Sequence, residues 1–196
     1  MTPVAPELPP QAPRMGNRLT RGFGRALLRL GGWRIVGQFP DVPRLVIIVA
    51  PHSSVWDGIW GVIGMLALGV RINFMAKAEL FRGPLGWLLR AVGGVPVERG
   101  RAHGAVEQAT ARLKGAAPAW FLLAPEGTRR RVEHWKSGFW HIARNAQVPL
   151  LCAHFHYPDK VMDLGTVLPL SDDPVADMAA IRAHYRPFVG RNRGTV

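Results

Sequence analysis

The chain has 196 residues, of which 48% are hydrophobic, and a formal net charge of +12 that comes almost wholly from arginine. Its length suits one domain with a substantial core, and its charge points to anionic partners: membrane headgroups, nucleic acid, coenzyme A phosphates or an acidic carrier protein. The single cysteine excludes an internal disulfide, so we expect the reducing cytoplasm as its setting.

The N-terminal region divides into a tail and a helix. Residues 1–13 are rich in proline and have no apolar core, so we expect a disordered or extended tail and no secretory signal. Residues 14–36 have the pattern of an amphipathic helix. Its basic stripe contains Arg18, Arg21, Arg25 and Arg29, and its apolar stripe contains Leu19, Phe23, Ala26, Leu27 and Leu30. This pattern is typical of a membrane-surface helix, although a helix that packs its apolar stripe on the domain core has it too.

The first chemical motif follows a buried strand. Residues 45–50 form a continuous apolar run, and Ser54 is placed to cap a helix that ends near residue 68. If His52 lies just before this helix, its ring can swing back to Asp57 and form a general-base dyad. The alternative is structural, because Ser54 and Asp57 also have the spacing of a capping box.

The second motif follows another apolar strand, at residues 118–124. Glu126, Gly127, Thr128 and Arg129 come directly after it, where α/β sheets place ligand sites. Glycine permits a tight turn, threonine offers a hydroxyl and arginine offers a planar fork for phosphate oxygens. Arg130 and Arg131 continue the run, and we interpret them as solvated surface residues.

The remaining segments alternate between strand and helix signals. Strands are expected at residues 72–76 and 150–156, and helices at residues 84–92, 104–114, 139–146 and 174–185. This order predicts a single α/β domain over residues 37–189, with a largely parallel sheet flanked by helices and a loose tail at residues 190–196. The longest apolar stretch, residues 55–70, contains Asp57 and four glycines and is too short to span a membrane.

In this order, the H-x4-D and E-G-T-R motifs resemble those of the lysophospholipid and glycerophosphate acyltransferases. The resemblance covers roughly residues 45–155 and implies that His52 is the general base, oriented by Asp57. It implies that Glu126 to Arg129 form a substrate-binding turn, in which Glu126 orders the turn and Arg129 holds the acceptor's phosphate. It also gives Arg99 a role in binding that phosphate, whereas the residues alone fit an ordinary surface arginine equally well. The fourth segment of the family is matched by residues 148–151, without its usual second proline.

The resemblance implies transfer of a fatty acyl group from acyl-CoA or acyl carrier protein to a lysophospholipid or glycerolipid hydroxyl, with lysophosphatidic acid as the first candidate. No cofactor and no nucleic acid are expected; an anionic membrane surface and acyl carrier protein are the expected partners. An enzyme acting on lysolipid must reach the bilayer, so residues 14–36 are expected to bind the cytoplasmic face. The alternatives are a basic, non-catalytic module that binds membrane or nucleic acid, and a lipid thioesterase or esterase.

Four histidines, the cysteine and a set of backbone N–H groups are further candidates for chemistry. His154 and His156, with His134 and His141, invite a zinc site, but no third ligand has a recognisable spacing, so we expect no metal. Cys152 lies in an apolar strand and is interpreted as a small core residue. Backbone N–H groups at the start of the helix after His52 are candidates for an oxyanion site.

Overall fold

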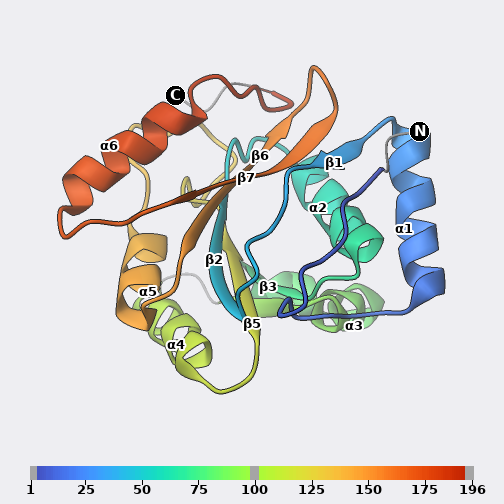
Figure 1. Ribbon diagram of the computed structural model, residues 1–196, viewed down its shortest axis with the longest axis horizontal. Helices are drawn as coiled ribbons and strands as arrows, with labels where there is room; N and C mark the ends of the chain where they lie inside the picture. Colours follow the sequence, from blue (N-terminus) through green and yellow to red (C-terminus); the bar gives the residue numbers. More distant parts are fainter. Residues whose placement is uncertain (1–3, 98–101, 193–196) are drawn as a thin grey trace.

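The apolar runs of the sequence become the strands of one seven-stranded sheet in the computed structural model, which describes residues 4–97 and 102–192 (Figure 1). The strands are β1 (Arg34–Val36), β2 (Arg44–Val49), β3 (Ile72–Lys77), β4 (Gly94–Val97), β5 (Ala119–Leu123), β6 (Leu150–His156) and β7 (Val161–Leu168). Their spatial order is β1-β7-β6-β2-β5-β3-β4, and every neighbouring pair is parallel except β6 and β7. The predicted α/β fold with a largely parallel sheet is therefore confirmed.

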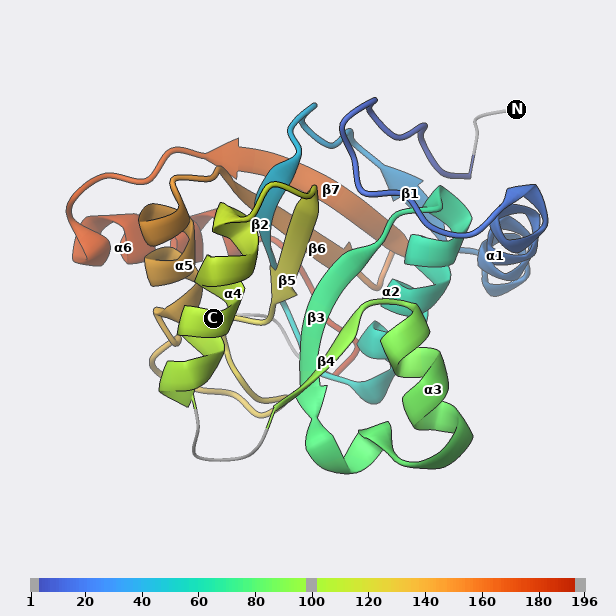
Figure 2. The same cartoon turned by 90° about the horizontal axis from the view of Figure 1, so that it is seen from below.

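Helices cover both faces of this sheet. They are α1 (Arg18–Gly31), α2 (Val55–Leu68), α3 (Gly83–Ala91), α4 (Ala102–Lys114), α5 (Gly138–Ala146) and α6 (Pro174–Tyr185), with a short 3₁₀ helix, η1 (Ala78–Phe81), before α3. Helices α1, α2 and α3 lie on one face, and α4, α5 and α6 lie on the other (Figures 1 and 2). The chain thus forms three layers, as expected when strands and helices alternate.

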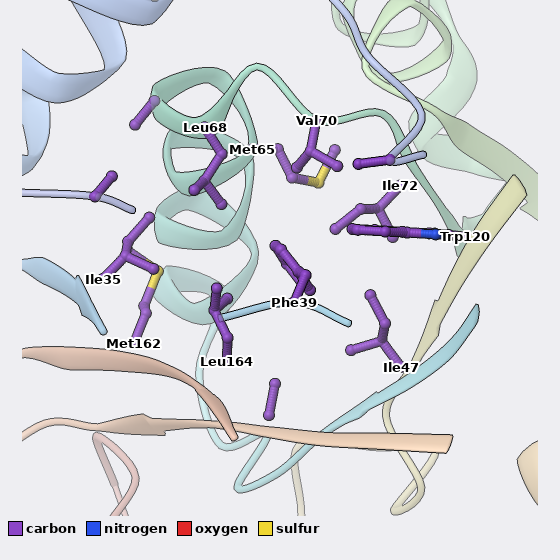
Figure 3. Packing of buried hydrophobic residues seen from close by; sticks show 14 of the residues in the cluster. Ile35, Phe39, Ile47, Met65, Leu68, Val70, Ile72, Trp120, Met162 and Leu164 are labelled. Carbon is purple, nitrogen blue, oxygen red and sulfur yellow. The ribbon is translucent and has the colours of Figure 1, made fainter. Parts of the chain in front are cut away.

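The central strand β2 supplies both cores because successive side chains point to opposite faces. Leu45 and Ile47 lie in the core on the α2 face, together with Trp120. Ile47 and Trp120 are labelled in Figure 3. Val46 and Ile48 pack on the opposite face, in the core that α4, α5 and α6 complete. A strand that is buried on both faces reads as a continuous apolar run, which is why β2 is evident in the sequence.

Strands β1 and β7 were not predicted from the sequence. β1 has only three residues, and β7 contains Asp163 and Gly165 and exposes Thr166 and Val167 at its end. Neither segment has the continuous apolar character that identified the central strands. β7 returns antiparallel after the tight connection from β6, and β1 then pairs with its outer edge.

The N-terminal tail, expected to be disordered or extended, is ordered in its described part and contains no helix. Its described residues, 4–13, lie on the domain: Ala5 and Ala12 are buried in the core on the α2 face. The N–H of Ile35 donates to the carbonyl of Val4 at 2.9 Å, and the N–H of Arg71 donates to that of Pro13 at 2.8 Å. The proline-rich composition does not predict this order, because the order comes from backbone hydrogen bonds to residues far along the chain.

Helix α1 packs on the domain through Gly24 and Leu28 rather than through its apolar stripe. At Gly24, a Cβ atom would lie only 2.5 Å from the backbone nitrogen of Ala67, so this close approach requires glycine. The apolar stripe points away from the domain: Leu19, Phe23 and Leu30 are 82%, 61% and 85% exposed. The alternative in which this stripe packs on the domain core is therefore wrong. No helix in the described ranges is long and apolar enough to cross a membrane.

Candidate active site

The topology gathers polar residues from distant parts of the sequence at one edge of the sheet. β6, β2, β5 and β3 are consecutive, mutually parallel strands, so their carboxyl ends meet at this edge. His52 comes after β2, Glu126 after β5 and Tyr157 after β6, and Lys77 ends β3. In open α/β sheets this edge is where ligands bind.

The histidine and aspartate of the first motif form a pair. Ser54 caps α2, and His52 lies just before it, in the turn that follows β2. Its Nδ1 is 3.3 Å from Oδ2 of Asp57, with the aspartate side chain 1% exposed and the histidine side chain 30% exposed. The ring therefore reaches solvent while its partner is dry, which is the arrangement expected of a general base and its orienting acid.

Asp57 also serves the helix cap, so the two alternatives drawn from the sequence coexist. Its Oδ2 accepts hydrogen bonds from the N–H groups of Ser53 and Ser54, each at 2.8 Å. Its Oδ1 accepts one from the hydroxyl of Tyr157 at 2.5 Å. One carboxylate thus closes the capping box and orients His52, and its position is fixed from three sides.

These contacts determine the protonation states of Asp57 and Tyr157. Burial by itself would raise the pKa of Asp57, but hydrogen bonds from His52, Tyr157 and Ser54 outweigh it, and the pKa is lowered. For Tyr157, burial and then the neighbouring carboxylate raise the pKa far above its ordinary value. Asp57 is consequently an anion at neutral pH, and Tyr157 keeps the proton that it donates to it.

Glu126 joins the two motifs. Its Oε2 accepts a hydrogen bond from the backbone N–H of His52 at 2.8 Å, and the residue is only 2% exposed. Glu126 was expected to order the turn of the second motif. The parallel pairing of β2 with β5 instead brings its side chain to the backbone of the first motif. The second motif therefore fixes the backbone that carries His52.

The rest of the second motif forms an exposed loop. Gly127 has a φ of 65°, in the left-handed region, and a Cβ there would lie 2.7 Å from Cε of Lys136. The hydroxyl of Thr128 accepts from the N–H of Arg130 at 3.3 Å. Arg129 and Arg131 are exposed. Backbone hydrogen bonds from Gly127 to Ala124 and from Lys136 to Pro125 shape this loop, while the side chains of Arg129 and Arg131 are accessible to solvent.

A pocket of about 690 Å³ lies between the two motifs. Its lining residues are Ser53, Ser54, Val55, Lys77, Thr128, Arg129, Arg130 and Asn192. Three cations and the amino-terminal end of α2 surround it, which suits an anionic group such as phosphate. Lys77 and Asn192 were missed in the sequence, because each lies far along the chain from both motifs. Arg99, expected to bind phosphate, lies outside the described residues.

The suggested oxyanion site is not supported at the first amides of the turn. The N–H groups of Ser53 and Ser54 donate to Asp57, and that of Trp56 donates to the side chain of Ser54 at 3.2 Å. These donors are occupied by the cap itself.

The side chains considered for metal binding or nucleophilic chemistry do not assemble. Across residues 4–97 and 102–192, no group of three or more histidine, cysteine, aspartate or glutamate side chains is placed to hold a metal ion. His154 is buried, whereas His134 and His141 are exposed. Cys152 is buried in β6, and burial raises the pKa of its thiol to about 12. A thiol in this state is a core residue rather than a nucleophile.

Comparisons with known proteins agree with the motifs and the fold. The family model described as Acyltransferase matches residues 37–155. Among solved structures, the chain is similar to the 1-acyl-sn-glycerophosphate (LPA) acyltransferase, PlsC, from Thermotoga maritima, with a TM-score of 0.52 and 24% identity. This match covers 69% of the chain but only 56% of the length of that protein, and at this identity it speaks for the fold alone. No curated protein matches.

Proposed function

This chain belongs to the acyltransferase family, and we propose that it transfers a fatty acyl group from a thioester to the hydroxyl of a lysophospholipid, with lysophosphatidic acid the first candidate acceptor. The observation that carries the proposal is the His52–Asp57 pair, 3.3 Å apart, next to a cationic pocket that begins at the following residues, Ser53 and Ser54. A base beside an anion site is what acylation of a phosphate-bearing alcohol requires.

In the proposed reaction His52 acts as a general base. The acceptor's hydroxyl gives its proton to Nε2 of His52 while its oxygen attacks the carbonyl carbon of the thioester. The carbon–sulfur bond then breaks, and the proton passes from His52 to the departing thiolate. Asp57, held as an anion by Tyr157 and two backbone amides, stabilises the imidazolium that forms between these steps.

The acceptor's phosphate is assigned to the cationic pocket. Arg129 offers a planar fork for two phosphate oxygens, and Lys77 faces it across the same pocket. Glu126 holds the backbone of His52 in place by accepting a hydrogen bond from its N–H group. The donor is the thioester of coenzyme A or of acyl carrier protein, and the leaving thiolate needs neither a metal nor a cofactor in this mechanism.

An apolar stripe on α2 suggests where the acyl chain lies. Trp56, Ile59, Ile63 and Leu66 share one side of this helix, and all of them are at least partly exposed. The stripe begins in the first turn of α2, and its last residue, Leu66, lines an apolar pocket of about 190 Å³ that residues of α3 and of the segment 15–20 complete. We assign the acyl chain to this path, because it leads from the reacting carbonyl along a continuous apolar surface.

The same side of the molecule has the features of a membrane-binding surface. Helices α1 and α3 flank α2 (Figure 2), and both expose large apolar side chains, among them Phe23 on α1 and Trp87 on α3. Arg18 and Arg29 lie exposed beside the apolar stripe of α1, where they would meet anionic headgroups. We therefore place the protein peripherally on the cytoplasmic face of the membrane, with acyl carrier protein as a possible donor partner.

Binding to liposomes of phosphatidylglycerol and phosphatidylcholine tests this surface. Serine at Leu19, Phe23 and Leu30 should abolish sedimentation with them, because each large apolar side chain that the bilayer buries contributes about 1.5–3 kcal/mol. Val175→Ser is the matched control, since Val175 is 77% exposed on α6, on the opposite side of the sheet. If the triple variant is folded and still sediments with the liposomes, the assignment of this surface is wrong.

The activity itself is tested with radiolabelled acyl-CoA and acyl carrier protein as donors and lysophosphatidic acid as acceptor. We expect labelled phosphatidic acid, and we expect Arg129→Gln to raise the KM for the acceptor about tenfold or more, whereas Arg131→Gln should not. Release of free fatty acid alone would identify a thioesterase. Absence of any product with either donor and a panel of lysolipids would leave the non-catalytic binding module as the function.

A further inference from the structure

The C-terminal segment, residues 188–192, is attached to the end of β6. It was expected to be loose from residue 190 onward, but the structure places its described part against the domain. The N–H of Tyr157 donates to the carbonyl of Val189 at 3.0 Å, and the N–H of Val189 donates to Nδ1 of His156 at 3.2 Å. The ring of Phe188 stacks on that of His154 with centroids 3.3 Å apart.

From this attachment the segment crosses to the turn that carries His52. The side-chain amide of Asn192 donates to the carbonyl of Ser53 at 2.8 Å, and its backbone N–H donates to the hydroxyl of Ser53 at 3.3 Å. The guanidinium of Arg191 lies 5.0 Å above the ring of Trp56, in the first turn of α2. Asn192 also lines the cationic pocket. The segment thus forms one wall of the proposed site.

Ser53 transmits this contact to the base. It is 3% exposed, and each of its three polar groups has a partner: the carbonyl and the hydroxyl bind Asn192, and the N–H donates to Asp57. Asp57 in turn contacts His52. A buried residue whose polar groups are all paired holds a single position, because any shift leaves a desolvated group without its bond.

We infer that Asn192 is a positioning residue for acyl transfer: it fixes Ser53, and through Ser53 it holds the carboxylate of Asp57 against His52. This inference rests on the proposed function. Asn192, like Tyr157, lies outside residues 37–155, the part that the family model matches. The family motifs supply the reacting pair, and this chain's own C-terminal third completes its support.

A stabilising clamp with no role in the reaction is the simpler explanation, and kinetics separate the two. Asn192→Ala should lower kcat about tenfold and leave the KM values for donor and acceptor within about twofold, since the side-chain amide of Asn192 donates to Ser53 and the cations of the pocket remain to bind the phosphate. Asn192→Asp should be at least as severe because a carboxylate would face the carbonyl oxygen of Ser53. Asn192→Gln, which keeps the amide, should recover part of the loss. Asn145→Ala is the matched control, at an exposed asparagine on α5.

Amide hydrogen exchange at Ser53 and Ser54, measured by NMR, tests the same inference without any substrate. In Asn192→Ala these amides should exchange about tenfold faster than in the unaltered protein, while amides of β2 should not change. If the unaltered protein transfers no acyl group, the proposed function fails, and this readout still decides whether Asn192 fixes the turn. Faster exchange with an unchanged kcat would reduce Asn192 to a clamp, and a lowered kcat with unchanged exchange would disprove the route through Ser53.

Discussion

Two of the histidine–aspartate pairs among the described residues have opposite patterns of burial. In the His52–Asp57 pair, 3.3 Å apart, the acid is 1% exposed and the histidine is 30% exposed. In the His154–Asp163 pair, 3.9 Å apart, the histidine is 7% exposed and the acid is 32% exposed. A general base needs an accessible ring and a dry, fixed carboxylate, so only the first pair is arranged for proton transfer.

The surroundings of His154 explain why the second pair is structural. Its ring stacks on Phe188, and its Nδ1 has no hydrogen-bond partner among the described residues. Burial lowers the pKa of His154 to about 4; Asp163 opposes this change, while His184 and His156 add to it. The ring is therefore neutral at physiological pH and packs as an aromatic group. The comparison teaches that separation alone does not identify a base, whereas the distribution of exposure within the pair does.

The largest expected effect is on catalysis. His52→Ala should lower kcat by about 10²–10⁴, as expected for loss of a positioned general base, with little change in thermal stability. His154→Phe keeps the aromatic stacking and should leave kcat within about threefold of the unaltered protein. The measurement is kcat at saturating donor and acceptor, with circular dichroism to verify folding. Equal losses in the two variants would break the comparison.

The next effect concerns stability below neutral pH. Because the pKa of His154 is lower in the folded protein than in the unfolded chain, the unfolded chain binds more protons between pH 6.5 and about 4. The free energy of unfolding should therefore fall as the pH falls through this window, by about 3 kcal/mol from this residue. Burial lowers the pKa of His184 too, so some dependence should persist without His154.

Urea unfolding at pH 7 and at pH 4.5 checks this prediction. His154→Phe should lose most of the pH dependence that is assigned to this residue, whereas His134→Phe, at an exposed position, should keep all of it. A His154→Phe protein as sensitive to acid as the unaltered one would show that His154 is not the group that titrates.

The smallest effect sharpens the description of the first pair. Tyr157→Phe removes only the hydroxyl that donates to Asp57, while its ring keeps its edge contact with Trp33. We expect kcat to fall roughly fivefold with unchanged KM values, because two backbone amides still hold the carboxylate. Initial rates at saturating substrate test this. An unchanged kcat would mean that those amides alone fix Asp57.

The sequence predicts the parts of this site that depend on neighbouring residues. The apolar run of β2, the cap at Ser54 and the reach of His52 to Asp57 follow from local spacing and helix geometry. The parallel sheet also follows, because alternating strands and helices leave few other arrangements. Local patterns therefore predict both the His52–Asp57 pair and the architecture that presents it.

The supports of the site could not be predicted in this way. Glu126 is 74 residues from His52, whose N–H group donates to it. Tyr157 is 100 residues from Asp57, and Asn192 is 139 residues from Ser53. Such bonds leave no periodicity or spacing in the sequence, since they depend on which strands become neighbours. Helix α1 gives a similar lesson: its contact surface depends on Gly24 meeting Ala67, which an amphipathic pattern does not reveal.

The central claim is that the acceptor attacks the thioester directly, with His52 as its base, and the kinetic order of the reaction tests this most directly. Initial rates should be measured over a grid of donor and acceptor concentrations. Intersecting double-reciprocal lines are predicted, because both substrates must be bound before the acyl group moves and because the thiol of Cys152 is buried and protonated. Parallel lines, together with an acyl group trapped on the protein in the absence of acceptor, would contradict the account.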